Sequence, residues 1–282
     1  MNKTPRVAAI HDMSGFGRCS MTVVLPTLGA MGAWCCPLQT AVLSANTAFP
    51  ATENAVFLDL TPQMERTMAH WQELGATFDG IYSGFLGSGA QIDLLRRFIK
   101  EFKNPNTLVV VDPVMGDHGA PYRTYTPELC RRMAELAAEA QLVTPNLTEA
   151  AILLGETYDD HPAKEKLQEW LKRLSLDGRR SVVLTGAKTG DGMVGAGCFD
   201  SQDGTSSFHM AEEVPGRFSG TGDLFTSVVT GSLLRGDRLS TACDRAVQFV
   251  AKCAKETIRQ GGNPAEGAMF EQFLGELANC VK

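Results

Sequence analysis

Short apolar segments of the chain alternate with longer segments in which apolar residues recur every three or four positions. The uninterrupted run LVVV at residues 108–111 is typical of a strand covered on both faces, because neither side of such a strand meets water. Similar runs predict further strands at residues 7–10, 40–43, 142–144 and 181–184. Buried parallel strands need helices on both sides, so the pattern predicts an α/β fold.

The intervening segments carry helix signals. Thr61-Pro62 and Thr126-Pro127 each offer an N-cap followed by proline at the first helical position, and Gly75 marks a helix end. We expect one apolar face of each helix to pack on the sheet. The apolar stripes are Met64, Met68 and Trp71, then Ile92, Leu95, Phe98, Ile99 and Phe102, then Leu129, Met133 and Leu136.

The pattern changes between residues 192 and 210. GMVGAGCF, the polar turn DSQDG and TSSFHM predict a hairpin at one edge of the sheet. Helical patterns follow at residues 224–235, 239–259 and 266–277. Since no linker-like stretch or internal repeat interrupts the chain, we predict a single domain over residues 1–282.

Composition narrows the function. The chain has 282 residues, 44% of them hydrophobic, which suffices for a packed core. A net charge of −6 argues against nucleic acid or anionic lipid as the main partner and favours a small molecule. The eight cysteines show no C-x-x-C spacing and are expected to be reduced. Without a signal-peptide pattern or an apolar stretch of about 20 residues, we expect a cytoplasmic protein with no membrane contact.

Polar residues directly follow the predicted strands. In open α/β sheets ligands bind outside the carboxyl ends of the strands, so these residues together predict a binding edge, although each alone could cap a helix or complete a turn. They are His11 and Asp12, Ser44 to Thr47, Asp112, Asn146, and Thr185 with Gly186.

The segment SGTGD at residues 219–223 is the strongest local feature, because a helical pattern follows it directly. Glycines at a helix start let backbone N–H groups approach an anion, and the helix dipole favours negative charge there. The pattern therefore predicts a phosphate site at Gly220, Thr221 and Gly222. Asp223 could simply cap the helix, but a carboxylate beside a phosphate could also take the proton of an attacking alcohol.

Other phosphate and catalytic motifs are missing from the sequence. No G-x-x-x-x-G-K-[ST] occurs, and the G-x-G pairs at residues 15–17 and 220–222 lack the third glycine of the dinucleotide fingerprint. The histidines show no metal spacing and no nucleophile elbow is present. These absences argue against a P-loop NTPase, a Rossmann dehydrogenase, a zinc enzyme and a serine hydrolase.

Three segments, in this order, resemble motifs of the ribokinase-like superfamily: VDPVMG at 111–116, TPNLTE at 144–149 and GTGD at 220–223. Within it the chain resembles the vitamin kinases that act on pyridoxal, pyridoxamine or hydroxymethylpyrimidine. FGRCS at 16–20 and YSGFLGS at 82–88 are similar to the bacterial pyridoxal/pyridoxamine kinase group. The resemblance covers nearly the whole chain and implies a three-layer α/β sandwich with a mostly parallel sheet.

The resemblance also implies roles for the polar residues. Asp223 would deprotonate the substrate alcohol, and the amides of residues 220–223 would bind the γ-phosphate of ATP. Residues 115–122 would form a flap whose glycines permit movement. The residues around the nucleotide phosphates and Mg²⁺ would be Asp112, Asn146 and Glu149. They would act partly through water, and direct ligation of the metal by these side chains is not implied. Thr185 would lie at a nucleotide-contact position.

The acceptor side leaves more than one substrate open. By resemblance, Asp12 and Thr47 would hold the heteroaromatic ring. DMSGFG at 12–17 is closer to the short loop of the hydroxymethylpyrimidine kinases, since long-looped pyridoxal kinases carry serine at the position of Asp12. SANT at 44–47 lies between the two patterns.

The leading hypothesis is therefore an ATP-dependent kinase of a vitamin B6 vitamer. The alternatives are a hydroxymethylpyrimidine kinase of thiamin synthesis, a non-catalytic protein that binds the vitamer or the nucleotide, and, more distantly, a sugar or nucleoside kinase. The resemblance further suggests a homodimer, in which the hairpin at 192–210 could take part. A requirement for a monovalent cation stays open.

Overall fold

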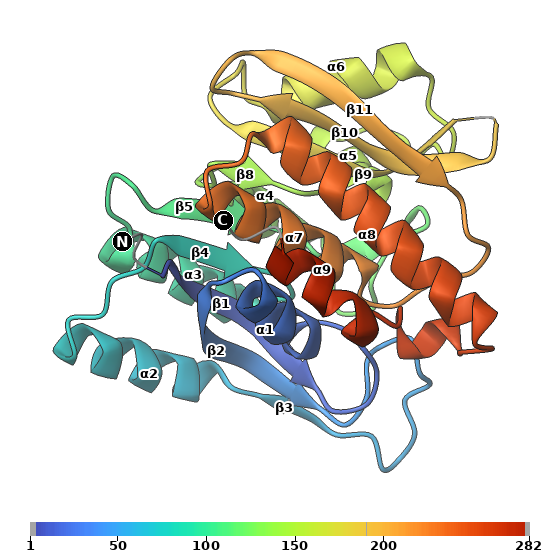
Figure 1. The fold of residues 1–282 in the computed structure, drawn as a ribbon. Helices are drawn as coiled ribbons and strands as arrows, with labels where there is room; N and C mark the ends of the chain where they lie inside the picture. The colour runs from blue at the N-terminus through green and yellow to red at the C-terminus, as the bar shows by residue number, and fades with distance from the viewer. Residues whose placement is uncertain (1–3, 190, 280–282) are drawn as a thin grey trace.

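The computed structural model describes residues 4–189 and 191–279. Within them, nine strands form one sheet in the order β11-β10-β9-β8-β5-β4-β1-β2-β3 (Figure 1). In sheet order, the strands β2, β1, β4, β5, β8 and β9 pair in parallel, whereas β3, β10 and β11 pair antiparallel. This confirms the predicted mostly parallel sheet. The bounds are β1 Arg6–Ser14, β2 Trp34–Leu43, β3 Phe57–Asp59, β4 Gly80–Ser83, β5 Leu108–Val111, β8 Leu142–Val143, β9 Ser181–Thr189, β10 Met193–Asp200 and β11 Thr205–Glu212.

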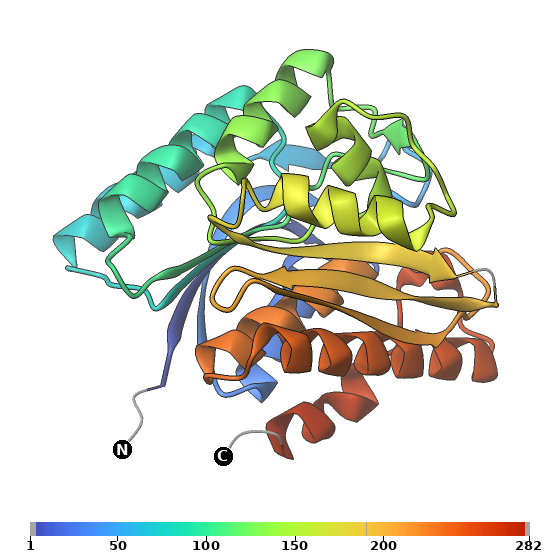
Figure 2. The ribbon, with the colours of Figure 1, turned by 90° about the horizontal axis from the view of Figure 1, so that it is seen from above.

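Helices cover both faces of the sheet, so the described chain has three layers (Figure 2). One face carries α2 to α6 and the other carries α1, α7, α8 and α9, and each layer has its own apolar core. The bounds are α1 Met21–Ala30, α2 Thr61–Glu73, α3 Gly89–Phe102, α4 Pro127–Ala137, α5 Leu147–Leu154, α6 Lys164–Leu174, α7 Thr221–Leu234, α8 Leu239–Arg259 and α9 Leu274–Asn279, with 3₁₀ turns at Pro264–Glu266 and Glu271–Phe273.

The sheet lies between these two cores, and this explains its uninterrupted apolar runs. In β1, Ala8 and Ile10 point into the core with α2 to α6, whereas Val7 and Ala9 point into the other core. All of these side chains are fully buried. Successive strand residues face opposite sides, so a strand covered on both faces is apolar over the run that lies between the two cores.

The predicted apolar helix stripes face the sheet, and one of the two predicted caps is confirmed. Thr126 caps α4, since its Oγ1 accepts the N–H of Leu129 at 3.2 Å. The cap expected at Thr61 is wrong: Thr61 is already helical and Leu60 precedes it. Asp59 accepts the Thr61 N–H at 2.8 Å instead, so a residue two positions upstream satisfies the helix start.

The helix expected over residues 266–277 is also wrong, because the chain there forms two 3₁₀ turns and the short α9. Gly267 has φ +91° and lies so close to Arg18 that a Cβ would be 2.5 Å from its carbonyl oxygen. A continuous helix cannot include that left-handed residue. The packing of this segment against the loop before α1 therefore decides its shape.

The hairpin predicted at residues 192–210 is present as β10 and β11 at one edge of the sheet. A second, smaller hairpin was not predicted and consists of β6 Gly116–Asp117 and β7 Ala120–Pro121. It falls inside the flap segment, where two-residue strands leave no readable alternation. In the part of the chain that the structure describes, no helix is long and apolar enough to cross a membrane.

The aromatic cluster under α3 gives a test of the core. Phe98 is fully buried, stacks on Phe102 at 4.4 Å between centroids and contacts Phe78 at 5.7 Å. We expect Phe98→Ala to lower the free energy of unfolding by about 3–5 kcal/mol, through lost burial and a residual cavity. Urea denaturation measures this. Leu74, whose side chain is exposed, serves as the control, and a Leu74→Ala loss as large as that of Phe98→Ala would contradict the packing.

Candidate active site

The parallel strands bring several of the predicted polar residues to one edge of the sheet. Asp12 lies inside β1, which continues past the predicted strand end to Ser14, whereas Asp112 directly follows β5 and Asn146 follows β8. The amide N–H of Asp112 donates to the Ser83 carbonyl of the neighbouring strand at 2.9 Å. The carboxyl ends of parallel strands are where α/β proteins bind ligands, so this edge is the candidate site.

The first turn of α7 reaches the same edge. Gly220, the residue before the helix, has φ +69°, and a Cβ there would be 2.0 Å from the carbonyl oxygen of Arg18. Both the positive φ and the lack of space exclude a side chain at Gly220. Gly222 has no such constraint, because a Cβ at this position would meet only Asp112 Oδ2, at 3.8 Å. The open side of this turn therefore faces Asp112.

The backbone amides of this turn lie where the sequence predicts an anion site. The first helical hydrogen bond runs from Leu224 N–H to the Gly220 carbonyl, at 3.0 Å. The N–H groups of Thr221, Gly222 and Asp223 precede that bond and have no partner within the helix. Free amides and the positive end of the helix dipole together favour an anion.

Asp223 lies in this turn, and its carboxylate contacts a different element. Its Oδ2 accepts the backbone N–H of Ser20 at 2.7 Å, whereas the helix start has no side-chain cap. Burial, with a smaller contribution from the charge of Asp12, raises the pKa of Asp223 to about 7, and the Ser20 hydrogen bond opposes this rise. A carboxylate with a pKa near neutrality suits proton transfer at physiological pH.

Ser20 was not recognised in the sequence. It precedes α1 with φ 50°, a left-handed conformation that is uncommon for serine and aims its N–H at Asp223. Nothing in the sequence FGRCS indicates this backbone geometry. The close approach of Gly220 to the Arg18 backbone places the two segments together.

Asn146 and Glu149 form a capping box at the start of α5. The Asn146 side chain accepts the Glu149 N–H at 2.9 Å, and Glu149 Oε2 accepts the Asn146 N–H at 2.9 Å. Their remaining polar atoms hold the flap: Asn146 Nδ2 donates to the Gly116 carbonyl, and Glu149 Oε1 accepts the Met115 N–H. These residues thus position the flap, whatever else they bind.

Two buried carboxylates stand close together beside the flap. Burial, the charge of Glu149 and the charge of Asp223 raise the pKa of Asp112 well above its usual range. Burial likewise raises the pKa of Glu149 to about 8, against its backbone hydrogen bonds. Such a crowding of acidic groups favours a cation among them.

The flap at residues 115–122 contains the small hairpin of β6 and β7. The N–H of its Gly119 donates to Thr148 Oγ1 at 2.8 Å, and its Gly116 packs so closely on β7 that a Cβ would be 2.4 Å from the Ala120 carbonyl oxygen. The hairpin therefore has a defined conformation and a firm contact with α5. Movement of the flap stays a prediction.

The sequence suggested that the strand ends at Thr185, but the structure shows that it continues. β9 continues to Thr189, with Gly186 at φ +75° where the pairing with β10 shifts by one residue. The bulge explains the error, because a glycine after an apolar run is also typical of a strand end. Thr185 N–H donates to the Pro145 carbonyl at 2.9 Å, so the residue still lies beside Asn146.

Asp12 and Thr47, the two residues predicted to bind the acceptor substrate, differ from each other in exposure. Asp12 is buried, accepts a 2.9 Å hydrogen bond from the Ser14 hydroxyl, and has its pKa raised mainly by burial. Thr47 is exposed, in a loop that Asn46 holds through a 3.0 Å bond to the Ala265 carbonyl. No hydrogen bond within the described residues joins Thr47 to Asp12 or Asp223.

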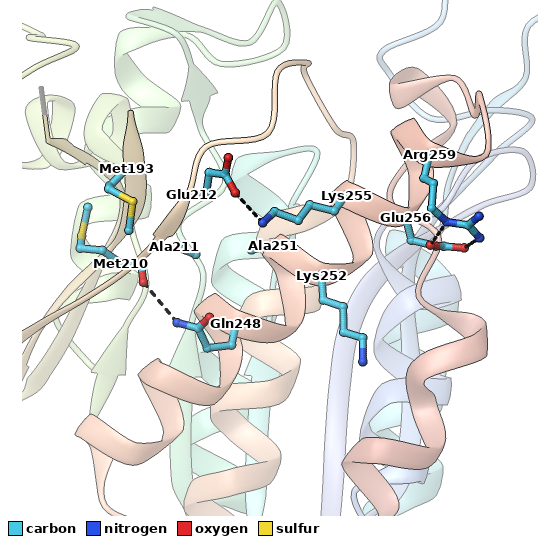
Figure 3. A pocket seen from close by; sticks show the side chains of 10 residues that line it. All are labelled: Met193, Met210, Ala211, Glu212, Gln248, Ala251, Lys252, Lys255, Glu256 and Arg259. Atoms are coloured by element: carbon cyan, nitrogen blue, oxygen red, sulfur yellow. Dashed lines mark hydrogen bonds and ion pairs between the residues drawn. The ribbon is translucent and has the colours of Figure 1, made fainter. Parts of the chain in front are cut away.

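A separate groove of about 610 Å³ lies between the hairpin and α8 (Figure 3). Its rim charges pair with each other: Lys255 with Glu212 at 2.7 Å, and Arg259 with Glu256. Gln248 donates to the Met210 carbonyl across it. None of the predicted site residues lines this groove, so it does not replace the edge of the sheet as the candidate site.

Comparison with known proteins gives a consistent picture. A family model described as phosphomethylpyrimidine kinase matches residues 25–267. A pyridoxine/pyridoxal/pyridoxamine kinase of Bordetella avium is 28% identical over 255 residues, which are 87% of this chain and 83% of that protein.

Solved structures agree in fold along the chain. A candidate phosphomethylpyrimidine kinase of Bacteroides thetaiotaomicron, in a crystal form with pyridoxal, is 41% identical with a TM-score of 0.93, covering 98% of this chain and 96% of that one. A pyridoxal kinase of Lactobacillus plantarum is 28% identical with a TM-score of 0.89, covering 98% of both chains.

The raised pKa of Asp223 predicts a pH-dependent cost in stability. Its pKa is about 7 in the folded chain and 3.8 for the free group, so the folded state binds the extra proton between these values. Stability therefore falls as pH rises from about 4 to about 7, by up to about 4 kcal/mol. We expect Asp223→Asn to melt higher than the wild type at pH 8 and nearly equally at pH 4.5, in thermal denaturation. A variant that is destabilised at pH 8 would contradict this.

The two glycines of the α7 turn should respond differently to alanine. Gly220→Ala adds a methyl group against the Arg18 backbone at positive φ, so we expect a loss of more than about 1 kcal/mol in urea denaturation. Gly222→Ala is the matched control. It meets no close neighbour and should leave stability unchanged or slightly higher. Equal losses in both variants would show that the turn is not held as described.

Proposed function

The chain belongs to the phosphomethylpyrimidine kinase family, and on that premise we propose that it is an ATP-dependent kinase of vitamin B6. Its substrate would be the 5-hydroxymethyl group of pyridoxal, pyridoxine or pyridoxamine. The observation that carries the proposal is the partly buried carboxylate of Asp223 in the same helical turn as the free amides of residues 221–223. The pyridoxal in the crystal of the Bacteroides relative favours a B6 vitamer over hydroxymethylpyrimidine.

In the proposed reaction the α7 turn holds the terminal phosphate of ATP. Preorganised amides stabilise the negative charge that develops on the transferred phosphoryl group, and they need no rearrangement during the step. Because Gly222 has no side chain, this phosphate site is open toward Asp112. Thr185, beside Asn146, would contact the nucleotide further along the same edge.

Asp223 would act as the general base. As the substrate oxygen forms its bond to the terminal phosphorus, the bond from that phosphorus to the ADP oxygen breaks and the alcohol proton passes to the Asp223 carboxylate. The products are the phosphorylated vitamer, ADP and a proton that leaves when Asp223 ionises again. Because the pKa of Asp223 is about 7, this base regenerates near neutral pH.

The acidic residues of the site fit a Mg²⁺ ion that travels with the nucleotide. Among the described residues no group of three metal-ligating side chains occurs, and both oxygens of Glu149 accept backbone hydrogen bonds. Asp112 and Glu149 would therefore hold the ion mainly through water, in keeping with the preference of Mg²⁺ for water and phosphate oxygens. The ion would neutralise charge on the phosphates.

Asp12 would face the ring of the vitamer, since it is buried in β1 and its charge acts on Asp223. Thr47 could join it only if its exposed loop closes over the substrate. The homodimer, the cytoplasmic location and a monovalent cation stay predictions.

An assay of purified protein with Mg-ATP tests the proposal. We expect phosphorylation of at least one of pyridoxal, pyridoxine and pyridoxamine, with hydroxymethylpyrimidine as the comparison substrate. Asp223→Asn should still bind ATP but lose about 10²- to 10⁴-fold in kcat, because the base is removed while the phosphate site is kept.

The other outcomes separate the alternatives. Turnover of hydroxymethylpyrimidine alone would identify the thiamin-pathway activity. Binding of ATP or vitamer without any turnover would identify a binding protein. Wild-type kcat in Asp223→Asn would remove the base from its role.

A further inference from the structure

His11 is a fully buried histidine that the proposed reaction does not use. It lies in β1 beside Asp12, and within the described residues neither ring nitrogen has a partner at good hydrogen-bond geometry, although a contact with the Tyr82 backbone raises the pKa of the ring against the larger effect of burial. Its Nδ1 is 3.8 Å from Oδ1 of Asp223. Buried polar groups in native proteins are nearly always satisfied, so an unsatisfied one beside a carboxylate at a candidate active site calls for an explanation.

The surroundings hold the imidazole ring in this orientation. Tyr82 contacts it edge-on, with 4.4 Å between centroids. Gly84 makes room for it, because a Cβ at this position would be 2.5 Å from His11 Nδ1. The pairing of β1 with β2 also shifts between His11 and Met13, and such bulges commonly re-aim side chains near active sites.

The chemistry of the pair assigns the donor. Burial lowers the pKa of His11 to about 3, so the ring is neutral at physiological pH and carries one N–H. An ionised carboxylate only accepts hydrogen bonds. The contact between His11 Nδ1 and the Asp223 carboxylate is therefore favourable when the ring hydrogen is on Nδ1. Ser20 N–H already occupies Oδ2 at 2.7 Å, which leaves Oδ1 for His11.

We propose that His11 is a positioning residue for Asp223: it donates its Nδ1 hydrogen to Oδ1 as the site closes on its substrates, so that both oxygens of the base are held. This inference rests on the proposed function, because it assigns His11 through the role of Asp223 as the base. The contact fixes the rotation of the carboxylate and favours its ionised form.

The structure places His11 Nδ1, among the described titratable side chains, 3.8 Å from the Asp223 carboxylate. Among the described residues, the acids raise rather than lower the proton affinity of the site, and the Tyr82 hydroxyl donates to the Asp223 backbone carbonyl instead. The titratable groups that face Asp223 are His11 and Asp12 of β1, Cys19 before α1, Tyr82 of β4, Asp112 after β5, and Tyr122 of the flap.

Two variants test the proposal against a purely structural role. His11→Asn keeps an amide N–H near the position of Nδ1, whereas His11→Leu removes the donor and keeps an apolar side chain. In pH profiles of kcat with Mg-ATP and a vitamer, we expect the acid limb of His11→Leu to move up by about 1 pH unit, with kcat at neutral pH about 10-fold lower. His11→Asn should stay near the wild type in both, and neither KM should change by more than about 3-fold.

A measurement without turnover separates this inference from the proposed function. Nitrogen-15 NMR of labelled histidine in the folded protein, with and without Mg-ADP and a vitamer, reports the tautomer of His11, and we expect the hydrogen on Nδ1 at pH 8 in the liganded protein. A hydrogen on Nε2 would overturn the proposal, as would an unchanged acid limb in a folded His11→Leu. Absence of kinase activity in the wild type would instead refute the proposed function, while the NMR result still decides the contact with Asp223.

Discussion

The candidate site depends on the close approach between the first turn of α7 and the loop before α1. The backbone of Gly220 lies against the backbone of Arg18, which leaves no space for a side chain. This contact brings the Ser20 N–H to the Asp223 carboxylate and aims the free amides of the helix at the edge of the sheet. The proposed base and the proposed phosphate site therefore come from one turn, and covalent geometry sets the distance between them.

The second constraint is the concentration of acidic groups at the edge of the sheet. Asp12, Asp112, Glu149 and Asp223 all have their pKa raised mainly by burial. Without a cation these groups oppose folding at neutral pH, which is the cost of keeping a base with a pKa near 7. A Mg-nucleotide would relieve part of this repulsion, so substrate binding and stability of the site are coupled through charge.

The two antiparallel hairpins have separate places in the molecule. The hairpin of β10 and β11 extends the sheet and carries the groove next to α8, away from the predicted site residues. The small hairpin of β6 and β7 lies over the site, where Asn146, Thr148 and Glu149 of the α5 start hold it. Helix capping and flap attachment thus use the same side chains.

The sequence by itself determined the parts that depend on local periodicity and on polar residues at strand ends. It predicted the twice-covered parallel sheet, the edge hairpin, the extent of α8 and the residues of the α7 turn, because burial on both faces and glycines at a helix start leave direct marks on the order of residues. Resemblance to a family added the roles that the residues alone left open.

Only the tertiary structure decided the contacts between segments far apart in the chain. The left-handed Ser20 that binds Asp223, the break of the last helix at Gly267, the continuation of β9 past Gly186 and the approach of His11 to Asp223 all depend on such contacts. The physical reason is that a backbone conformation or a buried polar contact is selected by the packing of a distant partner, which local sequence does not encode.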